Sequence, residues 1–202
     1  MKIIGLTGPS GAGKGLACRI FKTYGIPAVD TDGIYHELLT QKGEMTNELI
    51  AAFGHEILTE SGLVDRKALS ATVLGKPDTA ARLHTLNTIT HKYIMARAHD
   101  VLRTHERAGA CAVLIDAPQL FEAGVERGCD LTIAVLADRE TRIARICARD
   151  GITREQAERR IDAQKSDDFF RAHCHFILEN NGTALDLERE IRAFLENSGL
   201  GL

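Results

Sequence analysis

Short apolar runs alternate along the chain with longer stretches of helical spacing. Residues 3–6, 112–115 and 131–136 are almost continuously apolar, which is typical of strands buried on both faces of a parallel sheet. Two shorter runs, 26–29 and 175–178, have the same character. The pattern therefore predicts about five strands.

Between these runs the apolar residues recur every three or four positions, as on one face of a helix. This spacing follows the first strand at Leu16, Ile20 and Phe21, and it dominates almost all of residues 33–109. Thr153 and Gln156 have the spacing of a capping box, which predicts a helix beginning there. Alternating strands and helices indicate the α/β class with a parallel sheet.

The order of these elements predicts one domain with two insertions. We expect the core to consist of residues of about 1–32, 110–137 and 173–202, interrupted by a helical insertion at about 33–109 and an arginine-rich segment at about 138–172. At 202 residues the chain is long enough to bury a substantial core.

Composition narrows the function classes. The net charge of −3 argues against a protein that coats nucleic acid, and there is no apolar run near 18 residues to span a membrane. The N-terminus shows no signal peptide, so we expect a cytoplasmic protein. Five cysteines without a C-x-x-C pair predict buried free thiols in a reducing compartment. The sequence does not predict the oligomeric state.

The strongest motif lies between the first strand and the first helix. Residues 8–14, Gly-Pro-Ser-Gly-Ala-Gly-Lys, match the G-x-x-x-x-G-K pattern of a phosphate-binding loop. Glycines let the backbone curl so that successive N–H groups point inward, and the positive end of the helix dipole adds to the attraction for an anion. Lys14 would reach the β- and γ-phosphates, so we expect a nucleoside triphosphate site.

One position departs from this motif. A serine or threonine that ligates Mg²⁺ usually follows the lysine, whereas this chain has Gly15 and then Leu16. Because Mg²⁺ is commonly held by one or two protein groups together with phosphates and waters, a water could take the place of the hydroxyl. We expect phosphate binding to survive and the positioning of Mg²⁺ to be altered.

Carboxylates end two of the predicted strands, where ligands of parallel sheets bind. Asp32, just after the second strand, is the candidate base for an acceptor hydroxyl. Asp30 could serve equally well as a helix cap. Asp116 ends the third strand and is the candidate for organising Mg²⁺, directly or through water.

The arginine-rich segment carries nine Lys or Arg residues against seven Asp or Glu residues between Arg139 and Arg171. Most of these arginines have the spacing of a solvated helix face. Arg149 and Arg160 are the candidates for stabilising charge on a transferred phosphoryl group. His91 lies within a long predicted helix, and its spacing alone suggests a structural role.

Taken together, the chain resembles the dephospho-CoA kinases, a family of P-loop kinases with a three-layer fold. Each matching motif is weak alone, but their order and spacing are specific. The motifs are residues 5–8 with the loop, 29–32, 86–91, 116–122, Arg160-Ile161 with Gln164, and 179–182.

The resemblance implies transfer of the γ-phosphate of ATP to the ribose 3′-hydroxyl of dephospho-CoA, the last step of coenzyme A synthesis, with Mg²⁺. It implies that Asp32 is the catalytic base, that residues 138–172 form a mobile lid, and that the helical insertion faces dephospho-CoA. The ATP phosphates would be lined by Gly11, Ala12, Gly13, Lys14, Gly15 and Leu16, and the acceptor by His91, Leu120, Phe121 and Glu122.

Two other functions stay open at this stage. The loop also resembles that of cytidylate kinases, which would make the chain a nucleoside or nucleoside-monophosphate kinase, although residues 86–91 and 120–122 argue against it. Alternatively, Gly15 could have weakened catalysis and left a nucleotide-binding regulator. The intact Asp32 and Asp116 and the arginine-rich segment disfavour that function.

Overall fold

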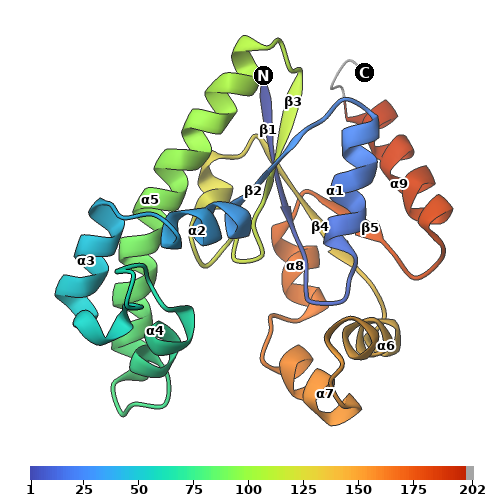
Figure 1. The fold of residues 1–202 in the computed structure, drawn as a ribbon. Helices are drawn as coiled ribbons and strands as arrows, with labels where there is room; N and C mark the ends of the chain where they lie inside the picture. The colour runs from blue at the N-terminus through green and yellow to red at the C-terminus, as the bar shows by residue number, and fades with distance from the viewer. Residues whose placement is uncertain (199–202) are drawn as a thin grey trace. The chain divides into compact units, whose positions relative to one another are not determined.

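The chain forms one five-stranded sheet (Figure 1). The computed structural model describes residues 1–198. Its strands lie in the order β2-β3-β1-β4-β5, and β1 pairs in parallel with β3 and β4, as β4 does with β5. The α/β class and the five strands predicted from the sequence are confirmed. The strands are β1 (Lys2–Thr7), β2 (Ala28–Asp30), β3 (Ala112–Asp116), β4 (Leu131–Leu136) and β5 (Phe176–Glu179).

Helices fill most of the remaining chain. They are α1 (Lys14–Thr23), α2 (Thr31–Leu39), α3 (Glu44–Phe53), α4 (Arg66–Val73), α5 (Thr79–Arg107), α6 (Arg139–Asp150), α7 (Arg154–Asp162), α8 (Asp167–His173) and α9 (Ala184–Asn197), with short 3₁₀ turns at His55–Ile57 and Val125–Gly128. Thr153 and Gln156 form the predicted capping box at the start of α7.

Contacts along the chain divide it into two compact units. One comprises Met1–Val29 with Thr104–Leu202, and the other comprises Asp30–Arg103. The second unit corresponds roughly to the predicted helical insertion. The functional bounds of the insertion and of the lid stay predictions.

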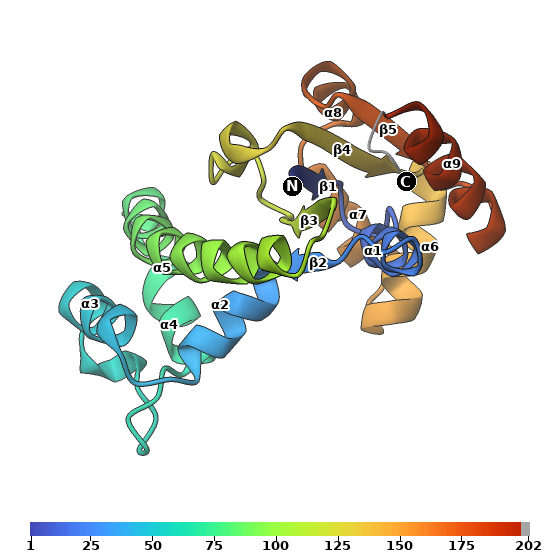
Figure 2. The same ribbon diagram turned by 90° about the horizontal axis from the view of Figure 1, so that it is seen from above.

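The two faces of the sheet bury different residues of the same strand. On β4, Ile133 and Val135 pack into the core beneath α1 and α9, and these two helices lie side by side in Figure 1. The alternate residues Ala134 and Leu136 pack against Phe170 of α8 on the opposite face (Figure 2). This alternation explains why the strand is apolar at every position.

The second unit has its own core. Leu39, Leu49, Ile57 and Leu69 are almost completely buried together, and Tyr93 of α5 packs against them. The cluster joins α2, α3, α4 and the first part of α5. The helical character predicted for residues 33–109 is therefore confirmed as a small helical unit with a hydrophobic centre of its own.

The cysteines correct one prediction. All five are free, as expected, but none is buried: Cys111 is exposed and the other four are half-buried. Cys18, Cys147 and Cys174 pack at the margins of hydrophobic clusters. Spacing on an apolar face could not distinguish the margin of a cluster from its centre.

The sheet core supplies a first test. Leu114 of β3 is completely buried, whereas Leu185 of α9 is 64% exposed. Leu114→Ala should lower the free energy of unfolding by about 2–5 kcal/mol because it leaves a cavity, and Leu185→Ala should change it by less than about 0.5 kcal/mol. Urea unfolding followed by circular dichroism measures both. Equal losses would contradict this description of the core.

Candidate active site

Three glycines shape the loop between β1 and α1. Gly8, Gly11 and Gly13 have φ angles of +144°, +81° and +103°, which side chains on L-residues rarely tolerate. A Cβ atom on Gly8 would lie 2.3 Å from the carbonyl oxygen of Val135, and one on Gly13 would lie 2.0 Å from Nδ2 of Asn180. The loop therefore requires glycine both for its conformation and for its close packing.

Side chains from distant elements bind three successive carbonyl groups of this loop. Arg142 Nε donates to the Ser10 carbonyl at 3.1 Å, and Arg145 Nη1 donates to the carbonyls of Gly11 and Ala12 at 3.4 and 3.3 Å. Asn180 Nδ2 donates to the Ala12 carbonyl at 2.7 Å. Since C=O and N–H point in opposite directions across a trans peptide, the following N–H groups are turned away from these side chains. Such a run of N–H groups is suited to an anion.

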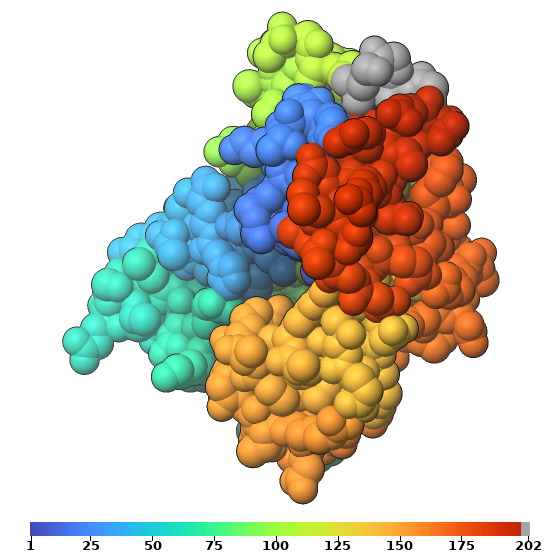
Figure 3. Space-filling model, turned by 90° about the vertical axis from the view of Figure 1, so that its right-hand side faces the viewer, coloured from blue at the N-terminus to red at the C-terminus, as the bar shows by residue number. Residues whose placement is uncertain are grey.

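Ser10 is held through both its N–H and its hydroxyl. Its N–H donates to Oε1 of Gln164 at 3.1 Å, and its hydroxyl accepts from Nη2 of Arg149 at 3.3 Å. Gln164 follows α7, so the arginine-rich segment contacts the loop from α6 and from the α7–α8 connection. Figure 3 shows α6 and α7 as one continuous surface, yellow to orange, and the two helices contact each other directly.

Lys14 and Asp116 form an ion pair beneath the loop. Their side chains are only 17% and 15% exposed. The second oxygen of Asp116 accepts a hydrogen bond from the Cys18 thiol at 3.3 Å. The structure thus brings the loop lysine together with the carboxylate that ends β3.

The side chains around Asp116 decide whether this position suits the Mg²⁺ ion that the family resemblance implies. Within residues 1–198, no three His, Cys, Asp or Glu side chains cluster as metal ligands. One carboxylate beside a phosphate loop nevertheless fits Mg²⁺, which takes most of its ligands from phosphates and waters. The assignment of the ion to Asp116 stays a prediction.

Arg149 and Arg160, the two arginines selected from the sequence, share one carboxylate. Arg149 Nε lies 2.7 Å from Asp150, and Nη1 of Arg160 pairs with the other oxygen of Asp150. The hydrogen bond from Arg149, followed by that from Arg160, lowers the pKa of Asp150 to about 2, so this carboxylate stays charged at neutral pH.

Three further residues, Arg142, Arg145 and Asn180, contact the loop backbone in a role that was not expected from the sequence. Arg142 and Arg145 share one helix face with Arg149, a spacing that was visible in the sequence. Asn180 is 2% exposed, and its Oδ1 is buried without a hydrogen-bond partner among the described residues. Its Nδ2 is the atom that donates to the Ala12 carbonyl.

The residues predicted for the acceptor side differ in exposure. Leu120 is completely buried and belongs to the core. Phe121 is half-buried and packs edge-on against Phe169, with ring centroids 5.2 Å apart. Glu122 lies 3.5 Å from Lys165 in an exposed ion pair.

Asp32 and His91 belong to the second unit. Asp30 caps α2 by accepting from the N–H of Gly33 at 3.0 Å, so capping accounts for this residue. Asp32 is exposed in the first turn of the same helix. His91 is half-buried on α5, and burial lowers the pKa of its imidazole, which favours the neutral form.

Fold and loop together define a P-loop kinase. A family model for dephospho-CoA kinases matches residues 2–186, and the chain therefore belongs to the dephospho-CoA kinase family. The resemblance noted in the sequence is confirmed, and the chain is a phosphotransferase.

Individual relatives agree over nearly the whole length. A dephospho-CoA kinase from Geobacter metallireducens is 37% identical over 193 residues, 96% of this chain and 94% of that protein. A crystal structure from Thermus thermophilus has 31% identity and a TM-score of 0.79, with 96% of each chain covered. A dephospho-CoA kinase from Campylobacter jejuni has the same fold, with 22% identity, a TM-score of 0.71 and coverage of 100% of this chain and 99% of that one.

None of the helices within residues 1–198 has the length and apolar character needed to cross a bilayer.

Gly13 allows a sharp test of the loop. Gly13→Ala should abolish measurable ATP binding, because the new methyl group would displace the buried Asn180 amide and strain a φ of +103°. Isothermal titration calorimetry with ATP measures the affinity. Gly128→Ala is the control, since a Cβ there meets no atom within 4 Å. An affinity of Gly13→Ala within about twofold of the parent chain would refute the loop's role.

Proposed function

We propose that the chain transfers the γ-phosphoryl group of ATP to the ribose 3′-hydroxyl of dephospho-CoA, with the loop of residues 8–14 seating the triphosphate. Family membership supports the reaction. The observation that most supports triphosphate binding at this loop is that three successive loop carbonyls accept hydrogen bonds from Arg142, Arg145 and Asn180.

The loop N–H groups expected to donate to the phosphates can be inferred from those that already donate within the protein. The N–H of Ser10 is used by Gln164, that of Ala12 donates to Pro9, and that of Leu16 donates to Gly13. We therefore expect the N–H groups of Gly11, Gly13, Lys14 and Gly15 to contact the phosphates, with Leu16 contributing less than the motif alone suggests. The ammonium group of Lys14 would then exchange Asp116 for the β- and γ-phosphates.

Asp32 is the proposed base. In phosphoryl transfer the protein mainly positions the reactants and stabilises charge, and an aspartate near the acceptor hydroxyl orients it and takes its proton. Asp32 is exposed in the first turn of α2, and the nearby Asp30 caps that helix. The proton would pass from the ribose hydroxyl to the Asp32 carboxylate as the new O–P bond forms.

Arg149 and Arg160 are the proposed lid arginines. Asp150 pairs with both of them, and Arg149 also donates to the Ser10 hydroxyl. Positive groups at that position would stabilise the charge that spreads over the transferred group. We further propose that residues 138–172 close over ATP.

The remaining assignments concern the acceptor, the metal and the compartment. We propose that His91, Phe121 and Glu122 contact dephospho-CoA, with Leu120 supporting them from the core. Mg²⁺ would be held through Asp116 and would neutralise phosphate charge. We propose a cytoplasmic enzyme that acts without nucleic acid or membrane partners.

Replacing Asp32 tests the proposed base. Asp32→Asn should lower kcat by roughly 10²-fold or more, because it removes the proton acceptor, and should leave ATP affinity nearly unchanged. A coupled assay for ADP release, run with dephospho-CoA and with CMP side by side, measures turnover and substrate class. Asp30→Asn is the matched control, because asparagine also caps helices well. Unchanged turnover of Asp32→Asn would remove this residue from the mechanism.

Gly15 tests the metal assignment. A Cβ there meets only the flexible end of Arg19, at 3.9 Å, so Gly15→Ser can be accommodated. The added hydroxyl should lower the Mg²⁺ concentration needed for half-maximal rate, or raise the rate itself. Gly15→Ala separates the hydroxyl from the methylene group. Identical Mg²⁺ titrations for the two variants would show that this position does not serve the metal.

A further inference from the structure

Arg142 is an unusually buried charge. It lies in the first turns of α6, and its side chain is only 5% exposed. A guanidinium group removed from water must have its donors satisfied by the protein. Each of its three guanidinium nitrogens lies within hydrogen-bond distance of a different partner.

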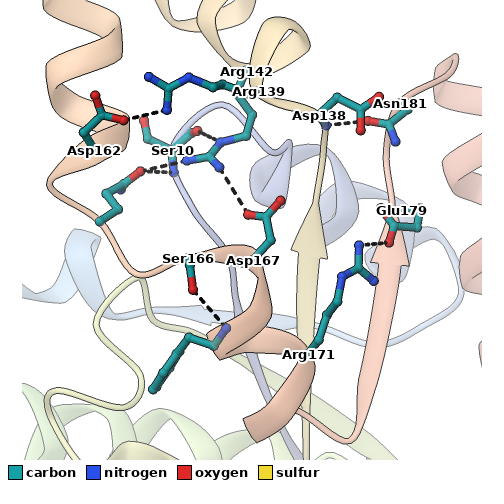
Figure 4. Close-up of polar contacts among 12 residues, drawn as sticks. Ser10, Asp138, Arg139, Arg142, Asp162, Ser166, Asp167, Arg171, Glu179 and Asn181 are labelled. Atoms are coloured by element: carbon teal, nitrogen blue, oxygen red, sulfur yellow. Dashed lines mark hydrogen bonds and ion pairs between the residues drawn. The ribbon is translucent and has the colours of Figure 1, made fainter.

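These three contacts join the loop to the arginine-rich segment. Nε donates to the Ser10 carbonyl at 3.1 Å, Nη2 donates to Oε1 of Gln164 at 3.2 Å, and Nη1 lies 3.3 Å from the Asp167 carboxylate (Figure 4). The guanidinium is thus used on the backbone and on two side chains, which leaves it poorly placed to bind phosphate.

Gln164 completes the arrangement. Its Oε1 accepts from Arg142 and also from the Ser10 N–H, at 3.1 Å. Both backbone groups of Ser10 are therefore held by side chains more than 100 positions away in the sequence. With its N–H and its carbonyl both fixed, Ser10 fixes the peptide plane that leads into Gly11.

Gly11 packs directly against the same part of α6. A Cβ on Gly11 would lie 2.7 Å from the carbonyl oxygen of Arg142 and 3.0 Å from its Cα. Rotation of the Ser10–Gly11 peptide would break the hydrogen bond from Arg142 to the Ser10 carbonyl, and the close approach of Gly11 to α6 leaves no room for a side chain there. The same peptide carries the first N–H group expected to contact a phosphate.

We propose that Arg142 and Gln164 are positioning residues for phosphoryl transfer, which hold Ser10 so that the loop N–H groups point at the triphosphate before it binds. The inference rests on the proposed seating of ATP in this loop. Neither side chain touches the nucleotide. Pre-organised donors bind a phosphate more tightly because no ordering cost is incurred on binding.

Gln164 is the better position for a test, because it is exposed and its replacement leaves the core intact. Gln164→Leu should weaken ATP affinity about tenfold, the size of one lost hydrogen bond to a charged or backbone group, and raise KM for ATP accordingly. KM for dephospho-CoA should change by less than about twofold. Gln164→Glu keeps an acceptor for both Ser10 and Arg142, so its ATP affinity should lie within about threefold of the parent chain.

Two controls separate positioning from general damage. Arg139→Gln removes an exposed ion pair between α6 and Asp162, 2.6 Å long, without touching the loop, and should leave both KM values unchanged. Arg142→Lys retains the charge but replaces the three nitrogens of the planar guanidinium, which reach three separate partners, by a single nitrogen, so ATP affinity should fall as in Gln164→Leu. A merely structural role would reduce the amount of active enzyme and leave KM unchanged.

ATP affinity is measured by calorimetry without dephospho-CoA, so the inference is tested even if no coenzyme A is formed. A parent chain that binds ATP but does not phosphorylate dephospho-CoA would refute the proposed function alone. Unchanged ATP affinity in Gln164→Leu, equal shifts of both KM values, or no recovery in Gln164→Glu would each overturn the positioning role.

Discussion

The anchoring of three consecutive loop carbonyls by side chains from distant elements is the interaction on which the site depends. A glycine-rich turn is flexible by nature, and its N–H groups form an anion site only when all point the same way. Here Arg142, Arg145 and Asn180 bind the carbonyls of Ser10, Gly11 and Ala12 from α6 and from the end of β5. The sheet contributes by bringing these distant segments to the carboxyl ends of β1 and β4, where the loop begins. Fold stability and nucleotide binding are therefore coupled through the same few hydrogen bonds.

Much of this architecture was predictable because its causes are local. The five strands are short apolar runs, the capping box at Thr153 is a four-residue pattern, and the loop is a contiguous motif. The anchors were not predictable, because nothing local distinguishes Arg142 from the exposed arginines around it. Its 5% exposure arises only when α6 meets the loop. The cysteines were misjudged for the same reason, since burial depends on which side of a cluster a helix presents.

The contacts of Asp116 are relevant to the missing hydroxyl at Gly15, because this carboxylate is the proposed Mg²⁺ ligand. Asp116 is paired with Lys14 and accepts a hydrogen bond from Cys18, so this carboxylate is oriented on both oxygens. Once Lys14 turns to the phosphates, as proposed, an oxygen of this carboxylate becomes free for a metal that lacks its usual hydroxyl ligand. The arginines of the arginine-rich segment fall into two groups with different partners. Arg142 and Arg145 serve the loop backbone, whereas Arg149 and Arg160 are gathered by Asp150, whose pKa near 2 keeps it negative.

The central claim is that the loop already presents its N–H groups to the triphosphate. A crystal structure with a non-hydrolysable ATP analogue measures this most directly. We expect β- and γ-phosphate oxygens within hydrogen-bond distance of the N–H groups of Gly13, Lys14 and Gly15, with Arg142 still bound to the Ser10 carbonyl. Phosphates bound elsewhere, or a Ser10 carbonyl turned toward the nucleotide, would contradict it.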